Sequence, residues 1–217
     1  MVGESDLLRS ALLDVAHQLD LPLSSAQADR LLAYLALLRQ WNATYNLTAI
    51  RDPAQMLTAH VADCLATVAP LHRQLRLGAT RLLDVGSGGG LPGVVIAILC
   101  PSLSVSCVDA VGKKAAFVQQ VAGELSLRNL RSQHARVEQL RDPSFDVVTS
   151  RAFATLTEFT QLTRRCLADT GIWMAMKGKT PSDELALLPT DVAVFHVEPL
   201  VVPGLGADRC LVWMRPA

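Results

Sequence analysis

Residues 84–93 form a glycine-rich segment, Asp-Val-Gly-Ser-Gly-Gly-Gly-Leu-Pro-Gly, directly after a short apolar run. Because glycine has no side chain, such a segment lets a ligand approach the backbone closely. Between the first strand and the first helix of a parallel sheet, it also lies at the edge where cofactors bind. Glycine clusters form plain tight turns as well, so the segment needs support from its neighbours before it predicts a cofactor site.

The residues around the glycines distinguish between two classes of cofactor. A dinucleotide-binding loop has glycine at its sixth position, where this chain has Leu91. Asp84 places a carboxylate near the loop, which suits an amino group better than a pyrophosphate. Asp109 follows about twenty residues later, where a carboxylate accepts hydrogen bonds from both hydroxyls of a ribose. The combination predicts S-adenosylmethionine rather than NAD; the alternative for Asp109 is a cap of the helix expected from Gly112 to Leu125.

The elements that must position these residues change in type near residue 78. Before it, apolar residues recur at helical spacing, Ser24 and Gln27 form a possible capping box, and Asp52 followed by Pro53 begins a further helix. After it, β-rich runs alternate with helical stretches, which is typical of a doubly wound parallel sheet. The predicted strands are Arg81–Val85, Ser104–Asp109, Asn129–His134, Phe145–Ser150, Ile172–Lys177, Val192–Val197 and Cys210–Arg215.

The last two predicted strands are joined by the loop 203–206, which is too short for a crossover helix, so they should be antiparallel. A seven-stranded, mostly parallel sheet with an antiparallel final hairpin is the arrangement of class I, Rossmann-like methyltransferases. We therefore predict an α/β chain with an N-terminal helical region, residues 1–78, and a methyltransferase domain, residues 79–217.

Composition excludes several other classes. The apolar runs are far shorter than the roughly 20 residues of a membrane span, and the first residues do not resemble a secretory signal. Five cysteines without a CxxC pair predict reduced thiols in a cytoplasmic protein, and the histidines have no spacing that indicates a metal. Twenty basic residues balance twenty acidic ones, but residues 113–165 contain nine Lys or Arg against five Asp or Glu, a local surplus that suits RNA.

Motifs along almost the whole chain resemble those of the RsmG family, also called GidB, bacterial methyltransferases that modify guanine N7 in small-subunit ribosomal RNA. They are Trp41-Asn42, Asn46-Leu47-Thr48, His60 with Asp63 and Leu65, residues 84–93, Asp109 with Lys113-Lys114 and Phe117, Arg136-Val137-Glu138, Ser150-Arg151-Ala152, and Lys177-Gly178 with Glu184. Cys64 is a departure, because the family often has serine there.

The resemblance implies S-adenosylmethionine as cofactor and ribosomal RNA or the small ribosomal subunit as partner. The family contacts imply cofactor-binding roles for Gly86, Leu91, Val137, Glu138 and Arg151, to which the loop and the second strand add Gly88 and Asp109. No catalytic base, metal or membrane is expected, and we expect a monomer.

Several residues have a second interpretation. Val137 and Glu138 could be a surface turn. Asn42, Asn46, Thr48 and His60 could fasten the helical region to the sheet rather than contact substrate, and Lys177-Gly178-Lys179 is a phosphate contact or a strand exit. An arginine after a buried strand, Arg151, is costly unless it meets a carboxylate or phosphate, which favours a role with cofactor or RNA.

Two other methyltransferase chemistries are not supported. The segment Ser150-Arg151-Ala152-Phe153 is not the Asn or Asp, Pro, Pro, aromatic motif of exocyclic-amine methylases, and no strand ends in the Pro-Cys pair of cytosine C5 methylases. The alternatives that remain are methylation of a small molecule or a protein, or a ribosome-binding module without catalysis.

Overall fold

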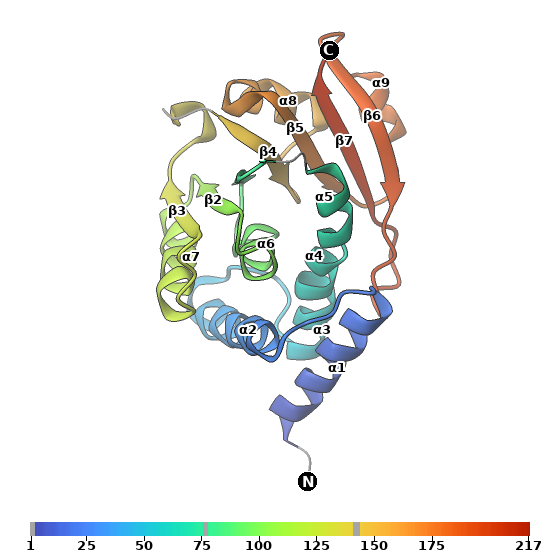
Figure 1. The fold of residues 1–217 in the computed structure, drawn as a ribbon. Coiled ribbons are helices and arrows are strands. Elements are labelled where there is room, and N and C mark those ends of the chain that lie inside the picture. Colours follow the sequence, from blue (N-terminus) through green and yellow to red (C-terminus); the bar gives the residue numbers. More distant parts are fainter. Residues whose placement is uncertain (1–2, 76–77, 141–143) are drawn as a thin grey trace.

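Seven strands form one sheet in the order β3-β2-β1-β4-β5-β7-β6 (Figure 1). The computed structural model describes residues 3–75, 78–140 and 144–217. The strands are β1 (Arg81–Val85), β2 (Ser104–Asp109), β3 (Leu130–His134), β4 (Phe145–Ser150), β5 (Leu167–Lys177), β6 (Val192–Pro199) and β7 (Cys210–Pro216). The first five are parallel, and β7 runs antiparallel between β5 and β6, which confirms the predicted class I arrangement.

Strand β5 begins at Leu167, five residues before the predicted start at Ile172. Leu167 pairs with Phe145 and Ile172 pairs with Val147, so the register shifts between these pairs. A Cβ at Gly171 would lie 2.7 Å from the carbonyl oxygen of Phe145, which explains the glycine there. Ala168, Asp169 and Gly171 have low strand propensity, so at this irregularity the sequence pattern does not indicate the first half of the strand.

The N-terminal region is helical, as predicted. Its elements are α1 (Glu4–Gln18), α2 (Ser25–Tyr45), α3 (Pro53–Met56), the π-helix η1 (Leu57–Ala62), α4 (Asp63–Leu65) and α5 (Val68–Gln74). The capping box of Ser24 and Gln27 is present, and the Asp52 side chain accepts a hydrogen bond from the backbone of Gln55. Both predicted helix starts are therefore confirmed, whereas the π-helical turn has no signal in the sequence.

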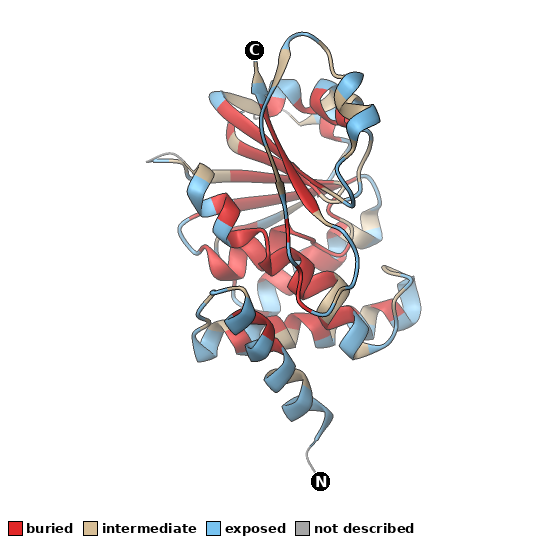
Figure 2. Cartoon of the chain, turned by 90° about the vertical axis from the view of Figure 1, so that its right-hand side faces the viewer, coloured by how far each residue is buried: buried red, intermediate tan, exposed pale blue. Residues whose placement is uncertain are grey.

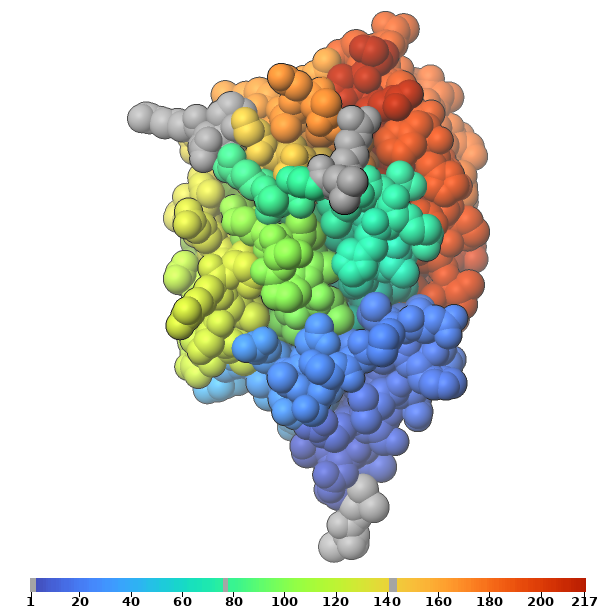
Figure 3. Space-filling view, in the orientation of Figure 1, coloured from blue at the N-terminus to red at the C-terminus, as the bar shows by residue number. Residues whose placement is uncertain are grey.

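The helices cover both faces of the sheet and give two cores (Figure 2). The larger core runs from Leu12 in α1 through α2, α6 (Gly93–Leu99) and α7 (Gly112–Glu124) to Trp213 in β7. The smaller lies under α8 (Leu156–Thr163) on the other face and includes Phe159 and Trp173. The space-filling view shows the blue N-terminal helices packed against the teal and green surface of α5 and α6 (Figure 3). The helical region thus shares its core with the sheet.

Short elements complete the chain: the 3-10 turns η2 (Val137–Gln139) and η3 (Arg164–Cys166), and α9 (Ser182–Ala186). Because β1, β2, β3 and β4 are parallel, the loops at 86–92, 110–111, 135–136 and 151–155 all leave the sheet at its carboxyl edge. Within the described ranges, none of the helices combines the length and the apolar character that a membrane span requires.

Candidate active site

The glycine-rich loop follows β1 and requires its glycines for two reasons. Gly86, Gly88 and Gly90 have φ angles of +63°, +58° and +84°, a left-handed conformation that is costly for other residues. A Cβ at Gly86 would also lie 2.6 Å from the ring of Phe153, and one at Gly90 would lie 2.4 Å from Val94. The loop is therefore too closely packed for a side chain at Gly86 and Gly90, and it needs the left-handed conformation at all three positions.

Asp109 ties this loop to the end of β2. One carboxylate oxygen accepts a hydrogen bond from the backbone N–H of Gly88 at 2.9 Å, and the other accepts from Val111 at 2.8 Å. Val111 is the N-cap residue of α7, so the helix-cap interpretation of Asp109 is partly realised. A carboxylate has about four lone-pair directions, and these two bonds leave room for further donors from a ligand.

A cavity of about 220 Å³ lies beside Asp109, at the carboxyl ends of β1, β2 and β3. It brings together four of the predicted cofactor residues, Gly86, Asp109, Val137 and Glu138. Val137 is buried at the start of η2, and Glu138 beside it is exposed. The complete lining is Val85, Gly86, Val108, Asp109, Ala110, Ala135, Arg136, Val137, Glu138, Phe153 and Leu162.

Leu91 and Arg151 do not line this cavity. The Leu91 side chain is buried in the larger core. Arg151 turns from the end of β4 towards the helical region, where its Nη1 donates to the Ala59 carbonyl at 2.9 Å and to Asp63 Oδ2 at 3.2 Å. The carboxylate that this arginine needs is therefore Asp63, a residue that the sequence indicates only as part of a motif.

A polar network joins elements of the helical region to one another next to Arg151. Asn42 donates to the Ile50 carbonyl at 3.0 Å and accepts from Thr48 N at 2.8 Å, and Thr48 Oγ1 lies 2.8 Å from His60 Nε2. His60 Nδ1 lies 3.1 Å from the Ala59 carbonyl oxygen. Burial, and next the charge of Arg151, lower the pKa of His60, so the ring is neutral near pH 7. Only His60 of this network reaches the sheet, with its Nδ1 3.4 Å from Arg151 Nη2, so the fastening role predicted for Asn42 and Thr48 stays a prediction.

Asn46 lies outside this buried network. It is the C-cap of α2, with a left-handed φ of +50°, and its side chain accepts from Arg51 at 3.2 Å. Its contacts are local to the exposed turn that follows the helix.

Asp84 is fully buried beneath the glycine loop. Its Oδ2 accepts a hydrogen bond from Gly93 N at 2.8 Å, and a Cβ at Gly93 would lie 2.9 Å from that oxygen and 2.5 Å from Cys107 Sγ. Its Oδ1 has no hydrogen-bond partner among the described residues. Burial raises the pKa of Asp84 to about 7, although the Gly93 bond and the charge of Arg151 oppose the shift. An unpaired buried oxygen of this kind is costly and indicates a missing donor.

Helix α2 supports the loop from the opposite side. The buried Tyr34 hydroxyl donates to the Gly89 carbonyl at 2.7 Å, and a Cβ at Gly89 would lie 3.1 Å from Leu38. Tyr34 was not among the predicted site residues, because a tyrosine in an apolar helical pattern predicts only a core position. Its contact depends on the packing of α2 against the loop.

Lys177 and Glu184 form an internal ion pair in the structure. Lys177 Nζ donates to Glu184 at 2.8 Å and to the Ala154 carbonyl at 3.1 Å, and Glu184 also accepts from Leu156 N at 2.7 Å. These bonds join the end of β5 to the start of α8. Lys179 remains exposed.

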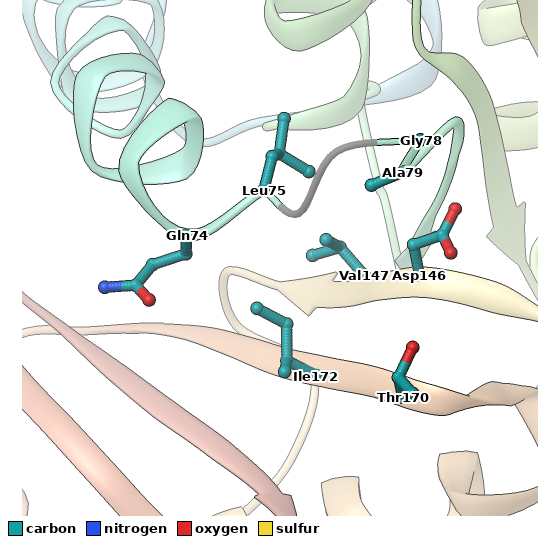
Figure 4. A pocket seen from close by; sticks show the side chains of 8 residues that line it. All are labelled: Gln74, Leu75, Gly78, Ala79, Asp146, Val147, Thr170 and Ile172. Carbon is teal, nitrogen blue, oxygen red and sulfur yellow. The ribbon is translucent and has the colours of Figure 1, made fainter.

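A second cavity, of about 190 Å³, lies at the amino edge of the sheet (Figure 4). Its polar wall includes Asp146, whose Oδ2 accepts from the backbones of Thr80 at 2.8 Å and Arg81 at 2.9 Å. Asp146 thus holds the start of β1, and no predicted site residue lines this cavity. In the described part of the chain, no cluster of three His, Cys, Asp or Glu is arranged to hold a metal ion, and the five cysteines are free and buried.

Comparison with known proteins gives a family and a fold. The family model described as GidB, rRNA small subunit methyltransferase G, matches residues 27–212. Ribosomal RNA small subunit methyltransferase G of Acidovorax ebreus (strain TPSY) is 60% identical over an alignment of 218 positions that covers 96% of each chain.

Two solved structures share the fold at low sequence identity. The 1,6-didemethyltoxoflavin-N1-methyltransferase of Burkholderia thailandensis, solved with S-adenosylhomocysteine, has a TM-score of 0.55 and 16% identity, and the match covers 90% of this chain and 92% of that one. A SAM-dependent methyltransferase from Aquifex aeolicus has a TM-score of 0.53 and 16% identity, with 75% and 98% covered.

We expect Asp84→Asn to change the pH dependence of stability. Folding raises the pKa of Asp84 from 3.8 to about 7, so the folded chain holds this proton more tightly than the unfolded chain. The free energy of unfolding of the unmodified chain should therefore fall as pH rises from about 4 to 7, by at most about 1.4 kcal/mol per pH unit from this group. The asparagine variant should lack this decline in urea titrations, whereas Asp14→Asn, at an exposed carboxylate, should keep it. An equal decline in all three proteins would contradict the prediction.

Proposed function

The chain belongs to the GidB family of small-subunit ribosomal RNA methyltransferases, and we propose that it transfers a methyl group from S-adenosylmethionine to N7 of a guanine in small-subunit ribosomal RNA. The observation that carries the proposal is the cavity at the carboxyl ends of β1 to β3, where the glycine loop meets Asp109, Val137 and Glu138. Methylation of a small molecule or protein, and a module without catalysis, are not favoured by this family membership.

The cleft fits the adenosine part of S-adenosylmethionine. The cavity offers apolar walls from Val108 and Val137 for the ring and the Asp109 carboxylate for the ribose hydroxyls. Asp109 would accept these hydroxyl bonds with the lone pairs that Gly88 and Val111 leave free. Val137 and Glu138 would meet the edge of the adenine through their backbone.

Groups that suit the amino-acid part of the cofactor lie next to the cavity, at the ends of β1 and β4. That part carries an ammonium and a carboxylate, and the chain offers Asp84, whose Oδ1 needs a donor, and the permanently charged Arg151. Gly86, Gly88 and the backbone of Leu91 would border the chain between the two ends. When bound, the cofactor supplies a methyl group on a positively charged sulfur.

Guanine N7 carries a lone pair and no proton, so the protein need not remove one. Alignment of the acceptor and the methyl group can contribute roughly 7 to 11 kcal/mol to lowering the barrier. The environment of His60 agrees with the absence of a base, because the ring is buried and both nitrogens have protein neighbours. N7 lies in the deep, narrow major groove of an RNA helix, so we propose that the target guanine is unpaired or displaced.

Apart from Arg151, which pairs with Asp63, the described basic residues of segment 113–165 divide between two edges of the sheet. Arg128, Arg131, Arg164 and Arg165 precede or begin β3 and β5 and lie at the amino edge, away from the cleft, and Arg141 lies outside the described residues. Lys113, Lys114 and Arg136 follow β2 and β3 and lie at the carboxyl edge. None of these three forms an ion pair within the described ranges. We therefore place the RNA contacts at the carboxyl edge.

Tyr45 extends this edge with an aromatic surface. The residue is 42% exposed at the end of α2, and Lys113 Nζ donates to its carbonyl oxygen at 2.9 Å. An exposed ring beside unpaired cations suits an unstacked base next to phosphates. We further propose that the chain acts as a monomer in the cytoplasm, a reducing compartment that agrees with its five free cysteines.

Transfer of labelled methyl from S-adenosylmethionine tests the proposed reaction. The protein is incubated with whole small subunits and, separately, with stripped 16S RNA, and the RNA is digested to nucleosides. We expect the label in 7-methylguanosine, with a much lower initial rate for Asp109→Ala at limiting cofactor, because a charge-assisted hydrogen bond is worth about 1.5 to 3 kcal/mol. The proposal would be contradicted if the label appeared in protein or in another nucleoside, or if no label were transferred. Comparison of whole subunits with stripped RNA shows which form of the substrate is methylated.

Charge reversal at the two edges tests the position of the RNA. Lys113→Glu with Arg136→Glu should weaken RNA binding and reduce the slope of log affinity against log salt by about 0.7 to 0.9 for each phosphate group that these cations neutralise. Arg128→Glu with Arg131→Glu, which makes the same change of charge at the amino edge, should leave the slope unchanged. If only the amino-edge variant changes the slope, the RNA lies on the other side of the sheet.

The dependence of the chemical step on pH tests the mechanism. With saturating cofactor and RNA, the single-turnover rate should be nearly constant from about pH 6.5 to 8.5, because no proton leaves N7. Saturating cofactor keeps the titration of Asp84 from entering through binding, and single turnover excludes product release. A tenfold rise that is absent in His60→Ala would show a general base and would rule out this mechanism.

A further inference from the structure

Asp63, in α4, is a buried carboxylate that two arginines of the sheet region share. Its side chain is 2% exposed. Its Oδ2 accepts from Arg151 at 3.2 Å, and its Oδ1 accepts from Arg209 Nε at 2.8 Å. Arg151 follows β4 and Arg209 precedes β7, so one carboxylate of the helical region joins two separate points of the carboxyl edge.

The contacts of Arg151 occupy one side of its guanidinium group. Nη1 donates to the Ala59 carbonyl and to Asp63. His60 Nδ1 lies 3.5 Å from Nη1 and 3.4 Å from Nη2, so it faces the end of the group between these two nitrogens. An arginine has five N–H donors. Among the described residues, no partner contacts Nε–H or the Nη2–H on the same side as Nε–H.

These two remaining donors are neighbours and point the same way. Nε–H and the adjacent Nη2–H form the side-on pair of an arginine, which matches the two oxygens of a carboxylate. The guanidinium is only partly covered, with 24% of the side chain exposed, and its charge lowers the pKa of Asp84 beneath the glycine loop. Arg151 directly follows β4, and Thr149 of β4 pairs with Asp84 of β1, so Arg151 leaves the sheet beside the strand end that carries Asp84 and the glycine loop.

The surroundings also set the charge of this end of the cleft. Asp63 brings one negative charge to two permanent positive charges, and His60 is neutral near pH 7. Within the cluster of Asp63, Arg151 and Arg209 one positive charge is left over, and in this partly buried place it attracts an anion more strongly than it would in water. Asp84 at the same end is the acidic group for the ammonium of the same ligand. Both the orientation and the excess charge favour an anionic ligand on Arg151.

We infer that Asp63 is a positioning residue, which with Ala59 and His60 holds one side of Arg151 so that the other side binds the carboxylate of S-adenosylmethionine. The inference rests on the proposed function for the identity of the cofactor. It makes the π-helical turn and α4, which lie outside the sheet, a necessary part of the cofactor site. Arg209 forms the second ion pair of Asp63 and anchors the segment before β7, and it does not contact the cofactor.

Two ligands separate this role from a general loss of structure. S-adenosylhomocysteine has the carboxylate, whereas 5′-methylthioadenosine has the same adenosine and sulfur without the amino-acid part. By calorimetry, Asp63→Asn should lower the affinity for S-adenosylhomocysteine about tenfold or more, as expected when a charge-assisted pair is misplaced. It should change the affinity for methylthioadenosine less than about twofold. Glu198→Gln is the matched control. Glu198 also forms an ion pair with an arginine, Arg73, at 2.5 Å, and this pair lies away from the cleft, so the substitution should change neither affinity.

A double-mutant cycle shows whether Asp63 acts through Arg151. In an Arg151→Gln background, Asp63→Asn should cause no further loss of S-adenosylhomocysteine affinity. If Asp63→Asn does not fold, His60→Gln replaces it, because His60 contacts the same side of Arg151. This variant should lose less affinity for S-adenosylhomocysteine than Asp63→Asn, and its affinity for methylthioadenosine should again change little.

Three results would overturn the inference: equal weakening of both ligands, unchanged binding of S-adenosylhomocysteine, or an effect of Asp63→Asn that persists without Arg151. Binding by the unmodified protein distinguishes these from a failure of the proposed function. A chain that does not bind S-adenosylhomocysteine at all lacks the proposed cofactor, whereas a chain that binds it and shows any of the three results lacks only the positioning role.

Discussion

Two buried carboxylates hold the backbone of the glycine loop, and the rest of the cleft depends on them. Asp109 accepts from Gly88 at the end of β2, and Asp84 accepts from Gly93 at the start of α6. A glycine-rich loop is costly to order, because glycine loses more conformational freedom on folding than any other residue. Fixed acceptors at both ends compensate that loss. They also place negative charge at the carboxyl edge, which suits a cofactor that carries hydroxyl and ammonium donors.

The helical region contributes to the cleft and does not merely precede it. Tyr34 bonds the outer turn of the glycine loop, and Asp63 balances Arg151 and Arg209. A guanidinium at the end of a buried strand would be costly without that carboxylate. The division of the chain into residues 1–78 and 79–217 stays a prediction, and one hydrophobic core extends across that boundary.

Strand direction determines which charges can serve the reaction. The parallel strands send all their carboxyl-end loops to the same edge, so residues that alternate along the sequence separate into two groups in space. Lys113 and Arg136 share an edge with the cavity, whereas Arg128 and Arg164 lie at the opposite edge. The local surplus of basic residues in segment 113–165 is therefore divided, and only part of it lies near the proposed acceptor. Strand direction also distinguishes the cavity beside Asp109 from the cavity beside Asp146, although the two are of similar size. The first lies at the carboxyl edge and is lined by predicted site residues, and the second lies at the amino edge and is not.

The order and type of the strands, the helix starts at Ser24 and Asp52, and the glycine loop with Asp109 could all be predicted from the sequence, because they depend on local propensity, caps and spacing. The first half of β5 could not, since a glycine and polar residues occupy a register shift there. The partner of each buried charge became known only from the folded chain: Asp63 is 88 residues from Arg151 and 146 from Arg209 along the sequence. Such pairs offset the cost of burying a charge, and they form between elements that meet only after folding. No local sequence pattern predicts which elements will meet.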